Sequence, residues 1–180
     1  MLIFNPIVFR YFVRFDLMKV LIVYDSVSPA RLTEKVAKTI EETLKEKRIE
    51  TENLFVANID LANVQNADCL LIGSPVMKFR ATGRIRKFLE RLSNSRLNIK
   101  LAAAFDTRLQ TKVSGSAVKS IEIKLKELGL KLAVSPLITY VEGSLRKNDW
   151  TLKGGELEKA KRWTEELTKA LSKQSAQMEQ

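Results

Sequence analysis

Short apolar runs alternate with amphipathic stretches along most of the chain. The runs have the length of strands, and their nearly continuous apolar character is typical of strands covered on both faces. Between them, apolar side chains recur every three or four residues, as a helix with one buried face requires. The predicted strands are 20–23, 51–57, 68–73, 99–105 and 131–140. The predicted helices are 33–47, 81–92, 118–128 and 157–171.

This alternation of strands and helices indicates an α/β domain with a parallel sheet and helices on both faces. In such sheets, ligands bind beyond the carboxyl ends of the strands, where the strand order reverses. The loops expected there are 25–33, 74–80 and 106–115, and they are the most polar connections that contain glycine, proline or serine. We therefore expect a binding site formed by these three loops.

Composition limits the chemistry that the side chains alone can perform. The 180 residues include no histidine and one cysteine, Cys69, which lies in an apolar run and is expected to belong to the core. A histidine-dependent triad, and a zinc site of histidines or several cysteines, are therefore excluded within one chain. Redox or group-transfer chemistry would have to come from a bound cofactor. A lone cysteine forms no internal disulfide, which fits a reducing, cytoplasmic location.

The formal net charge of +10 has two interpretations. The protein binds a negatively charged partner, such as an acidic protein, an anionic membrane surface or nucleic acid, or its lysines and arginines simply form a solvated surface. No nucleic-acid-binding motif is present, so we expect no nucleic-acid partner. The segment 78–91 carries six basic residues against one acid, Glu90. This basic strip either faces an acidic partner or a phosphorylated substrate, or is a solvated helix face.

Residues 1–17 are apolar and aromatic, but Arg10, Arg14 and Asp16 interrupt them. No apolar run approaches the roughly 20 residues of a membrane-spanning helix. Three interpretations stay open: an arm that binds a membrane surface or a partner, an extra element packed on the domain, or a segment upstream of a true start at Met18. We expect one domain over 18–172 and a polar tail over 173–180.

The segment 19–33 combines a buried strand, a polar loop and the opening of a helix. Ser28 and Pro29 predict the start of that helix, because serine caps free amides and proline fits the first helical position. A helix start that follows a strand is suited to bind an anion. Neither G-x-G-x-x-G nor G-x-x-x-x-G-K-[ST] occurs, so a dinucleotide-binding motif and an ATP-hydrolysing P-loop are not expected.

Several motifs, in order along the chain, carry a resemblance to a known family. VLIVYDS followed by TEKVA is similar to the first strand, loop and helix of the flavodoxin family, and LLIGSPV followed by RKFLERL is similar to its third strand, flavin loop and next helix. AAAFDT, GSA and ELGLKL resemble its fourth strand, third loop and following helix, and GGELEKAKRW its last helix. The resemblance covers about 19–171. It implies a flavodoxin-like three-layer α/β sandwich with a five-stranded parallel sheet in the order 2-1-3-4-5. A receiver domain is not expected, because Gly73-Ser74-Pro75 stand where its phosphate-accepting aspartate would be.

The resemblance also implies FMN, held without a covalent bond. The first loop would take the phosphate, and the second and third would flank the ring system. The cofactor-binding residues that the resemblance implies are Ser26, Ser28, Arg31, Thr33, Ser74, Pro75, Val76, Met77, Phe79, Asp106, Thr107 and Arg108.

The first loop departs from the family pattern. Pro29-Ala30-Arg31-Leu32 stand where the family carries a Gly-Asn pair, and proline donates no amide. Arg31 either compensates for the missing amide by binding the phosphate with its guanidinium, or fills the pocket.

Phe79 either stacks on the ring system of FMN or belongs to the core or rim. Asp25 and Asp106 both end strands and would bind Mg²⁺ if they met, but no third carboxylate accompanies them.

These observations lead to two alternative functions. The first is an FMN-binding electron carrier or small flavin-dependent oxidoreductase, with a redox partner protein that the basic strip suggests is acidic. The second is a flavodoxin-fold binding or regulatory module that has lost flavin and uses its basic face. No side chain is a convincing general acid or base, which favours a carrier over a substrate-specific enzyme.

Overall fold

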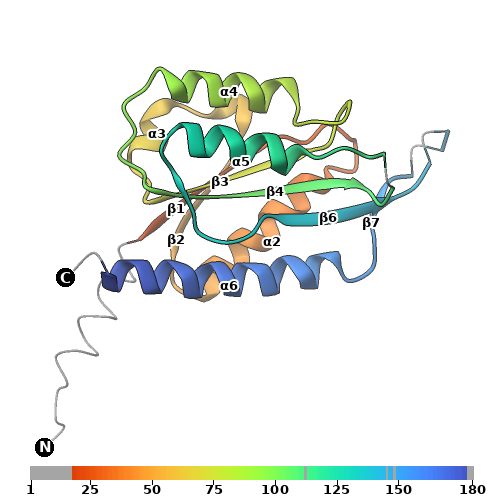
Figure 1. Ribbon diagram of the computed structural model, residues 1–180. Coiled ribbons are helices and arrows are strands. Elements are labelled where there is room, and N and C mark those ends of the chain that lie inside the picture. The colour runs from red at the N-terminus through yellow and green to blue at the C-terminus, as the bar shows by residue number, and fades with distance from the viewer. Residues whose placement is uncertain (1–17, 112, 145, 148, 178–180) are drawn as a thin grey trace, which may run out of the picture.

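The structure, a computed structural model, describes residues 18–111, 113–144, 146–147 and 149–177. Within that part of the chain, one sheet has the strand order β2-β1-β3-β4-β6-β7, and β5 also pairs with β4 (Figure 1). All neighbouring strands are parallel except β6 and β7, which are antiparallel. The strands are β1 (Lys19–Tyr24), β2 (Glu50–Phe55), β3 (Cys69–Pro75), β4 (Leu101–Leu109), β5 (Lys131–Leu132), β6 (Leu137–Glu142) and β7 (Thr151–Leu152).

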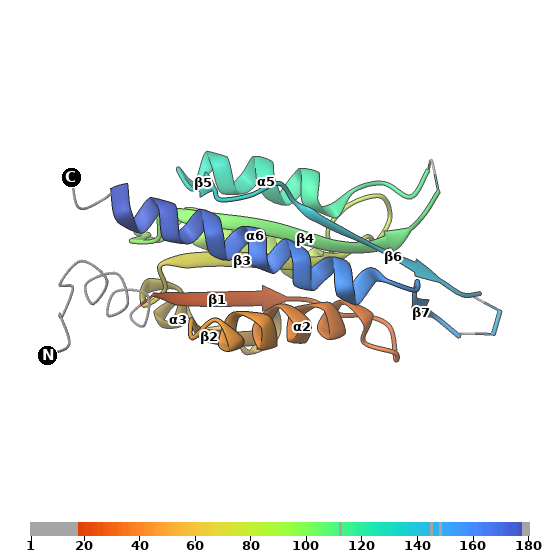
Figure 2. The same ribbon diagram turned by 90° about the horizontal axis from the view of Figure 1, so that it is seen from below.

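Helices cover both faces of this sheet (Figures 1 and 2). One layer holds α3 (Leu61–Gln65), α4 (Gly83–Ser93) and α5 (Ala117–Glu127), together with the short helix η1 (Val56–Asn58). The other layer holds α2 (Leu32–Glu46) and α6 (Glu156–Gln177). The predicted three-layer flavodoxin-like α/β fold is therefore confirmed.

Alternate residues of β1 show how the apolar runs divide between the layers. Leu21 and Val23 pack in the core with α4 and α5, whereas Val20 and Ile22 pack in the core with α2 and α6. All four are fully buried. Successive strand side chains point to opposite faces, so a strand covered on both sides must be apolar throughout.

The predicted fifth strand is wrong as a single element. It is divided into β5 and β6 around Pro136, and both pieces pair with β4. Proline has no N–H to give to a sheet, which explains the interruption. A further strand, β7, adds an antiparallel edge beside β6.

Two predicted loop boundaries are also wrong. β4 continues to Leu109, so Asp106, Thr107 and Arg108 lie in the strand rather than in the loop that follows it. Ser28 and Pro29 form a turn, closed by a hydrogen bond from the Arg31 amide to the Ser28 carbonyl at 3.0 Å. The helix therefore begins at Leu32, after the start that Ser28 and Pro29 predicted and one residue before the predicted range 33–47.

The interpretations of residues 1–17 lie outside the described residues. At the other end, α6 continues to Gln177, beyond the predicted limit of the domain. Over the described residues, no helix is both long and apolar enough to cross a membrane.

Candidate functional site

The carboxyl ends of the parallel strands lie on the right-hand side of Figure 1. Residues at and beyond these ends line a cavity of about 400 Å³. All three predicted loop regions contribute to it, and so does the connection between β6 and β7. Most of its lining is apolar, with hydroxyl groups distributed around it. The described residues that line it are Val27, Ser28, Pro29, Leu32, Thr33, Pro75, Val76, Met77, Thr107, Arg108, Leu109, Ser114, Val141 and Trp150.

The first loop is held at its base by Asp25, which is fully buried at the end of β1. Arg84 of α4 donates to both oxygens of this carboxylate, with its shortest contact, from Nη2 to Oδ1, at 2.7 Å. The guanidinium of Arg84 also lies 5.1 Å from the centre of the Phe55 ring. The next residue has a free polar group: Ser26 Oγ is buried and has no hydrogen-bond partner among the described residues.

The start of α2 carries its own ion-pair cluster. Arg31 has a left-handed backbone (φ 50°), and no described side chain caps the helix there. Its guanidinium pairs with Glu34, which also accepts from Lys38 Nζ at 2.9 Å. Burial alone would raise the pKa of Glu34, but Lys38 and Arg31 together hold that pKa below its ordinary value. Arg31 is thus engaged with the helix and does not line the cavity.

The second loop makes a tight turn beyond β3, closed by two backbone hydrogen bonds between Met77 and Arg80. Lys78 and Phe79 at its tip both have positive φ (48° and 70°), which is uncommon for residues other than glycine. The Phe79 side chain is 69% exposed and does not line the cavity. Ser74 is buried below the turn, where its hydroxyl accepts from the Thr82 amide at 3.0 Å.

Gly115 of the third loop packs directly against the second loop. A Cβ at this position would lie 2.3 Å from Phe79 Cα, and the Ser116 amide donates to the Phe79 carbonyl at 3.1 Å. Gly115 also has a φ of +77°. The two loops therefore support each other through backbone contacts that only glycine permits here.

Asp106 organises the end of β4. One of its oxygens accepts from the amides of Ala117 and Val118, both at 3.1 Å, at the start of α5. Arg108 completes the arrangement with two hydrogen bonds to the same carboxylate, at 2.9 and 2.5 Å. Asp106 is fully buried and is not part of the cavity lining, whereas Arg108 is.

Thr107 links two walls of the cavity. Its hydroxyl lies 2.8 Å from the hydroxyl of Thr33 on α2, and both residues line the cavity.

The Asp25 and Asp106 carboxylates, considered above as ligands for Mg²⁺, are each paired with an arginine. Within the part of the chain that the structure describes, no cluster of three or more His, Cys, Asp or Glu side chains could hold a metal ion.

The structure brings together seven of the twelve residues predicted for the site: Ser28, Thr33, Pro75, Val76, Met77, Thr107 and Arg108. The other five do not line the cavity: Ser26, Arg31, Ser74 and Asp106 each lie next to a lining residue in the chain, and Phe79 lies two residues after Met77. The sequence prediction missed Trp150, which lines the cavity from the β6–β7 connection. A tryptophan in a polar loop after an apolar strand was the available signal.

A family described as NADPH-dependent FMN reductase matches residues 18–136. A curated relative, a flavodoxin from Clostridium saccharobutylicum, is 28% identical over 127 residues, which cover 70% of this chain and 74% of the relative.

Solved structures share the fold. Flavodoxin 1 from Bacillus cereus aligns with a TM-score of 0.69 and 19% identity over 84% of this chain and 97% of its own. The rubredoxin:oxygen oxidoreductase of Desulfovibrio gigas aligns with a TM-score of 0.71 and 18% identity, over 88% of this chain but only 37% of its own.

Proposed function

Because the chain belongs to the NADPH-dependent FMN reductase family, we propose that it binds FMN without a covalent bond in the cavity at the carboxyl ends of β1, β3 and β4. The family binds FMN, which confirms the prediction of the cofactor. In this proposal the protein is an electron-transfer protein or small oxidoreductase that passes electrons to a redox partner. The observation that carries it is a single cavity lined by all three loops predicted to hold the flavin.

The volume and position of the cavity suit FMN. A volume of about 400 Å³ is in the usual range for small-molecule sites. The cavity lies where β1 and β3 meet and the chain order of the strands reverses, which is the usual ligand position in sheets of this kind.

The first loop supplies groups that fit a phosphate. Ser26 Oγ is buried without a partner among the described residues, and a buried hydroxyl of this kind is satisfied by a ligand oxygen or water. The start of α2 has no side-chain cap in the described structure, so its first amides are open to an anion. Pro29 donates no amide, but Ser28 and Thr33, which both carry hydroxyl groups, line the cavity. These residues therefore fit the phosphate of FMN.

The other walls fit the ring system. Val76, Met77, Leu109 and Val141 give the cavity apolar surfaces that bind a flat aromatic group and exclude water from it. FMN supplies the reversible uptake of electrons when bound, which the side chains cannot do. Arg108, whose guanidinium is fixed by Asp106, is the one ionisable side chain among the described lining residues. The described walls therefore bind the ring system and shield it from water.

The surface around the cavity suits an acidic partner. Lys78, Arg80, Arg84 and Lys87 of the basic strip are exposed, whereas the nearby carboxylates of Asp25 and Asp106 are buried against arginines. Val27 and Met77 separate the cavity from a neighbouring hollow that Arg84 and Lys87 help to line. Positive charge beside an electron-transfer site steers a negatively charged partner toward it. We therefore propose an acidic redox partner.

Titration of the full chain with FMN, followed by flavin fluorescence and absorption, tests this function. Leu109→Glu places a charge in the cavity wall, and we expect it to weaken FMN binding by about tenfold or more, since a charge is costly in an apolar site. Ile123→Glu on α5 is the matched control: both residues are exposed aliphatics, 41% and 52%, but Ile123 does not line the cavity.

Saturable binding that is weakened by Leu109→Glu and not by Ile123→Glu supports the proposal. A wild-type chain that does not bind FMN contradicts it and favours the alternative, a flavin-less binding module. Equal affinity of all three proteins would show that FMN binds elsewhere.

A further inference from the structure

We infer that Trp150 contacts the ring system of FMN and is a main determinant of flavin affinity in this protein. The inference rests on the proposed function and assigns a role to a residue outside the part of the chain that matches the family, which ends at 136. Trp150 comes from the connection between β6 and β7, not from any of the three loops that the flavodoxin resemblance implies.

Trp150 is the one aromatic side chain among the described residues that line the cavity. The other walls are aliphatic or carry small hydroxyl groups, apart from Arg108. An aromatic ring binds a flat aromatic ligand better than an aliphatic side chain of similar area, because the two π systems stack. Trp150 is only half-buried, so part of its surface is open to a ligand.

The backbone around Trp150 is closely constrained. β7 pairs with β6 through Leu152 opposite Val141 and Thr151 opposite Glu142. Gly143, with a φ of +142°, lies against the Trp150 backbone so closely that a Cβ there would be 2.8 Å from Trp150 Cα. Strand pairing on one side and this close contact on the other fix the position of the tryptophan.

Two further contacts tie this segment to the rest of the site. Lys153 Nζ donates to Gln110 Oε1 at 2.7 Å, which joins the end of β7 to the third loop. The Lys153 amide donates to the Tyr140 carbonyl at 3.0 Å. Leu152 packs on the core layer that contains α2 and α6. Trp150 is thus held at the cavity by a supported element and not by a free loop.

Phe79, the aromatic residue predicted from the sequence, also has a closely packed backbone, but its ring differs from that of Trp150 in exposure and in its relation to the cavity. It is 69% exposed, it is absent from the cavity lining, and its backbone rather than its ring contacts Gly115. The chain therefore offers a matched comparison between two aromatic residues on the same side of the molecule.

The experiment titrates FMN into the full-length wild-type chain and the variants Trp150→Ala, Trp150→Phe and Phe79→Ala. Far-ultraviolet circular dichroism and thermal unfolding without FMN check that each variant is folded. The readouts are the dissociation constant and the fluorescence of bound FMN, which a tryptophan in contact with the ring quenches.

We expect Trp150→Ala to weaken FMN binding by about tenfold, the usual effect of removing one stacking aromatic residue, and to make bound FMN more fluorescent. Trp150→Phe should retain more of the affinity than Trp150→Ala. Phe79→Ala should change the dissociation constant by less than about twofold, since its ring does not line the cavity.

If the wild-type chain binds FMN and Trp150→Ala binds it with the same affinity and the same fluorescence, this inference fails while the proposed function stands. A larger loss of affinity for Phe79→Ala than for Trp150→Ala would overturn it as well. If the wild-type chain does not bind FMN, both the proposed function and this inference are wrong.

Discussion

Asp106 shows how a residue close to a site can have a different role from the one its position suggests. It lies within β4, three residues before the strand ends, and is followed by residues that line the cavity. Alternate side chains of a strand point to opposite faces, so Thr107 meets Thr33 of α2 while Asp106 meets the start of α5. The carboxylate therefore fixes Arg108 and the amino end of α5, and it reaches the cavity only through Arg108.

The single cysteine, Cys69, provides a direct test of whether β3 is buried in the core. It is fully buried in β3, and burial raises the pKa of its thiol to about 12. The reactive thiolate is thus scarce at pH 8, and the sulfur is inaccessible. We expect the native protein not to react with Ellman's reagent at pH 8 and to release one equivalent of thionitrobenzoate after unfolding in guanidinium. Rapid reaction of the native protein would show that β3 is not buried as described.

At the scale of elements, the sequence predicted the sheet and its helices well, because continuous apolar runs and four-residue periodicity reflect burial directly. It could not predict where local hydrogen bonds end an element. The turn from Ser28 to Arg31 delays α2, and Pro136 divides the last parallel strand. The same limit applies to the site. The three loops were predicted from their order along the chain. Trp150 lies in a polar loop whose place at the cavity depends on the antiparallel pairing of β6 and β7, and the sequence pattern did not predict that pairing.

The contact between the second and third loops predicts how a substitution at Gly115 affects stability. Gly115→Ala would place a methyl group against the Phe79 backbone at a φ of +77°, and we expect it to lower the free energy of unfolding by about 2 kcal/mol. Gly154→Ala is the matched control, because no atom lies within 4 Å of its added Cβ. Urea denaturation of both variants measures the difference. Equal stability would mean that the two loops do not touch as described.

The ion-pair cluster at the start of α2 predicts a pH dependence. Lys38 and Arg31 lower the pKa of Glu34 in the folded protein below the ordinary value of 4.5. The cluster therefore stabilises the fold above that value, and the contribution is lost as the pH falls through the lowered pKa. We expect Glu34→Gln to reduce the free energy of unfolding by about 1 kcal/mol at pH 7, with a clearly smaller effect at pH 3. Urea denaturation at the two pH values gives the comparison, and a loss that is as large at pH 3 as at pH 7 would refute the ion-pair role.

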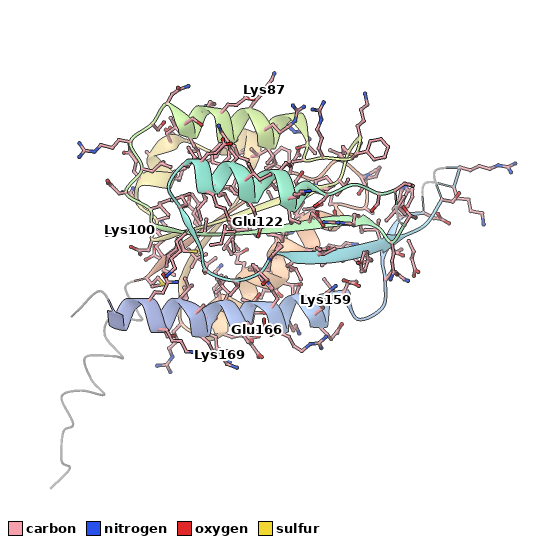
Figure 3. The ribbon with its side chains drawn as sticks, viewed as in Figure 1. Lys87, Lys100, Glu122, Lys159, Glu166 and Lys169 are labelled. Carbon is pink, nitrogen blue, oxygen red and sulfur yellow. The ribbon has the colours of Figure 1, made fainter. Side chains whose placement is uncertain are left out.

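At the scale of the whole molecule, the two helical layers differ in how close their basic side chains lie to the cavity. Lys87 lies on α4, in the layer next to the second loop, and Lys169 lies on α6 across the sheet (Figure 3). Only the first of these lysines lies beside the cavity, where it lines the hollow next to Met77. The proposed acidic partner should therefore respond to charge on one side of the protein alone.

Charge reversal tests that expectation. We expect Lys87→Glu to slow electron transfer between the reduced, FMN-loaded protein and a small acidic iron–sulfur protein several-fold at low salt, with a smaller effect at high salt. Lys169→Glu changes the net charge equally and should have little effect. Stopped-flow kinetics over a range of ionic strength measures both. Equal effects of the two variants would show that only the net charge matters, and that no docking face exists on α4.

The claim on which the rest depends is that FMN occupies the cavity between the three loops and the β6–β7 connection. Hydrogen–deuterium exchange of the full chain, with and without saturating FMN, tests it most directly, because a bound ligand slows local opening of the backbone that it contacts. We predict protection in 26–33, 75–80, 106–115 and 141–152. Residues 92–97 and 124–128, which line a separate hollow between α4 and α5, should exchange as before. Unchanged exchange in the four segments, or protection confined to the second hollow, would contradict the account.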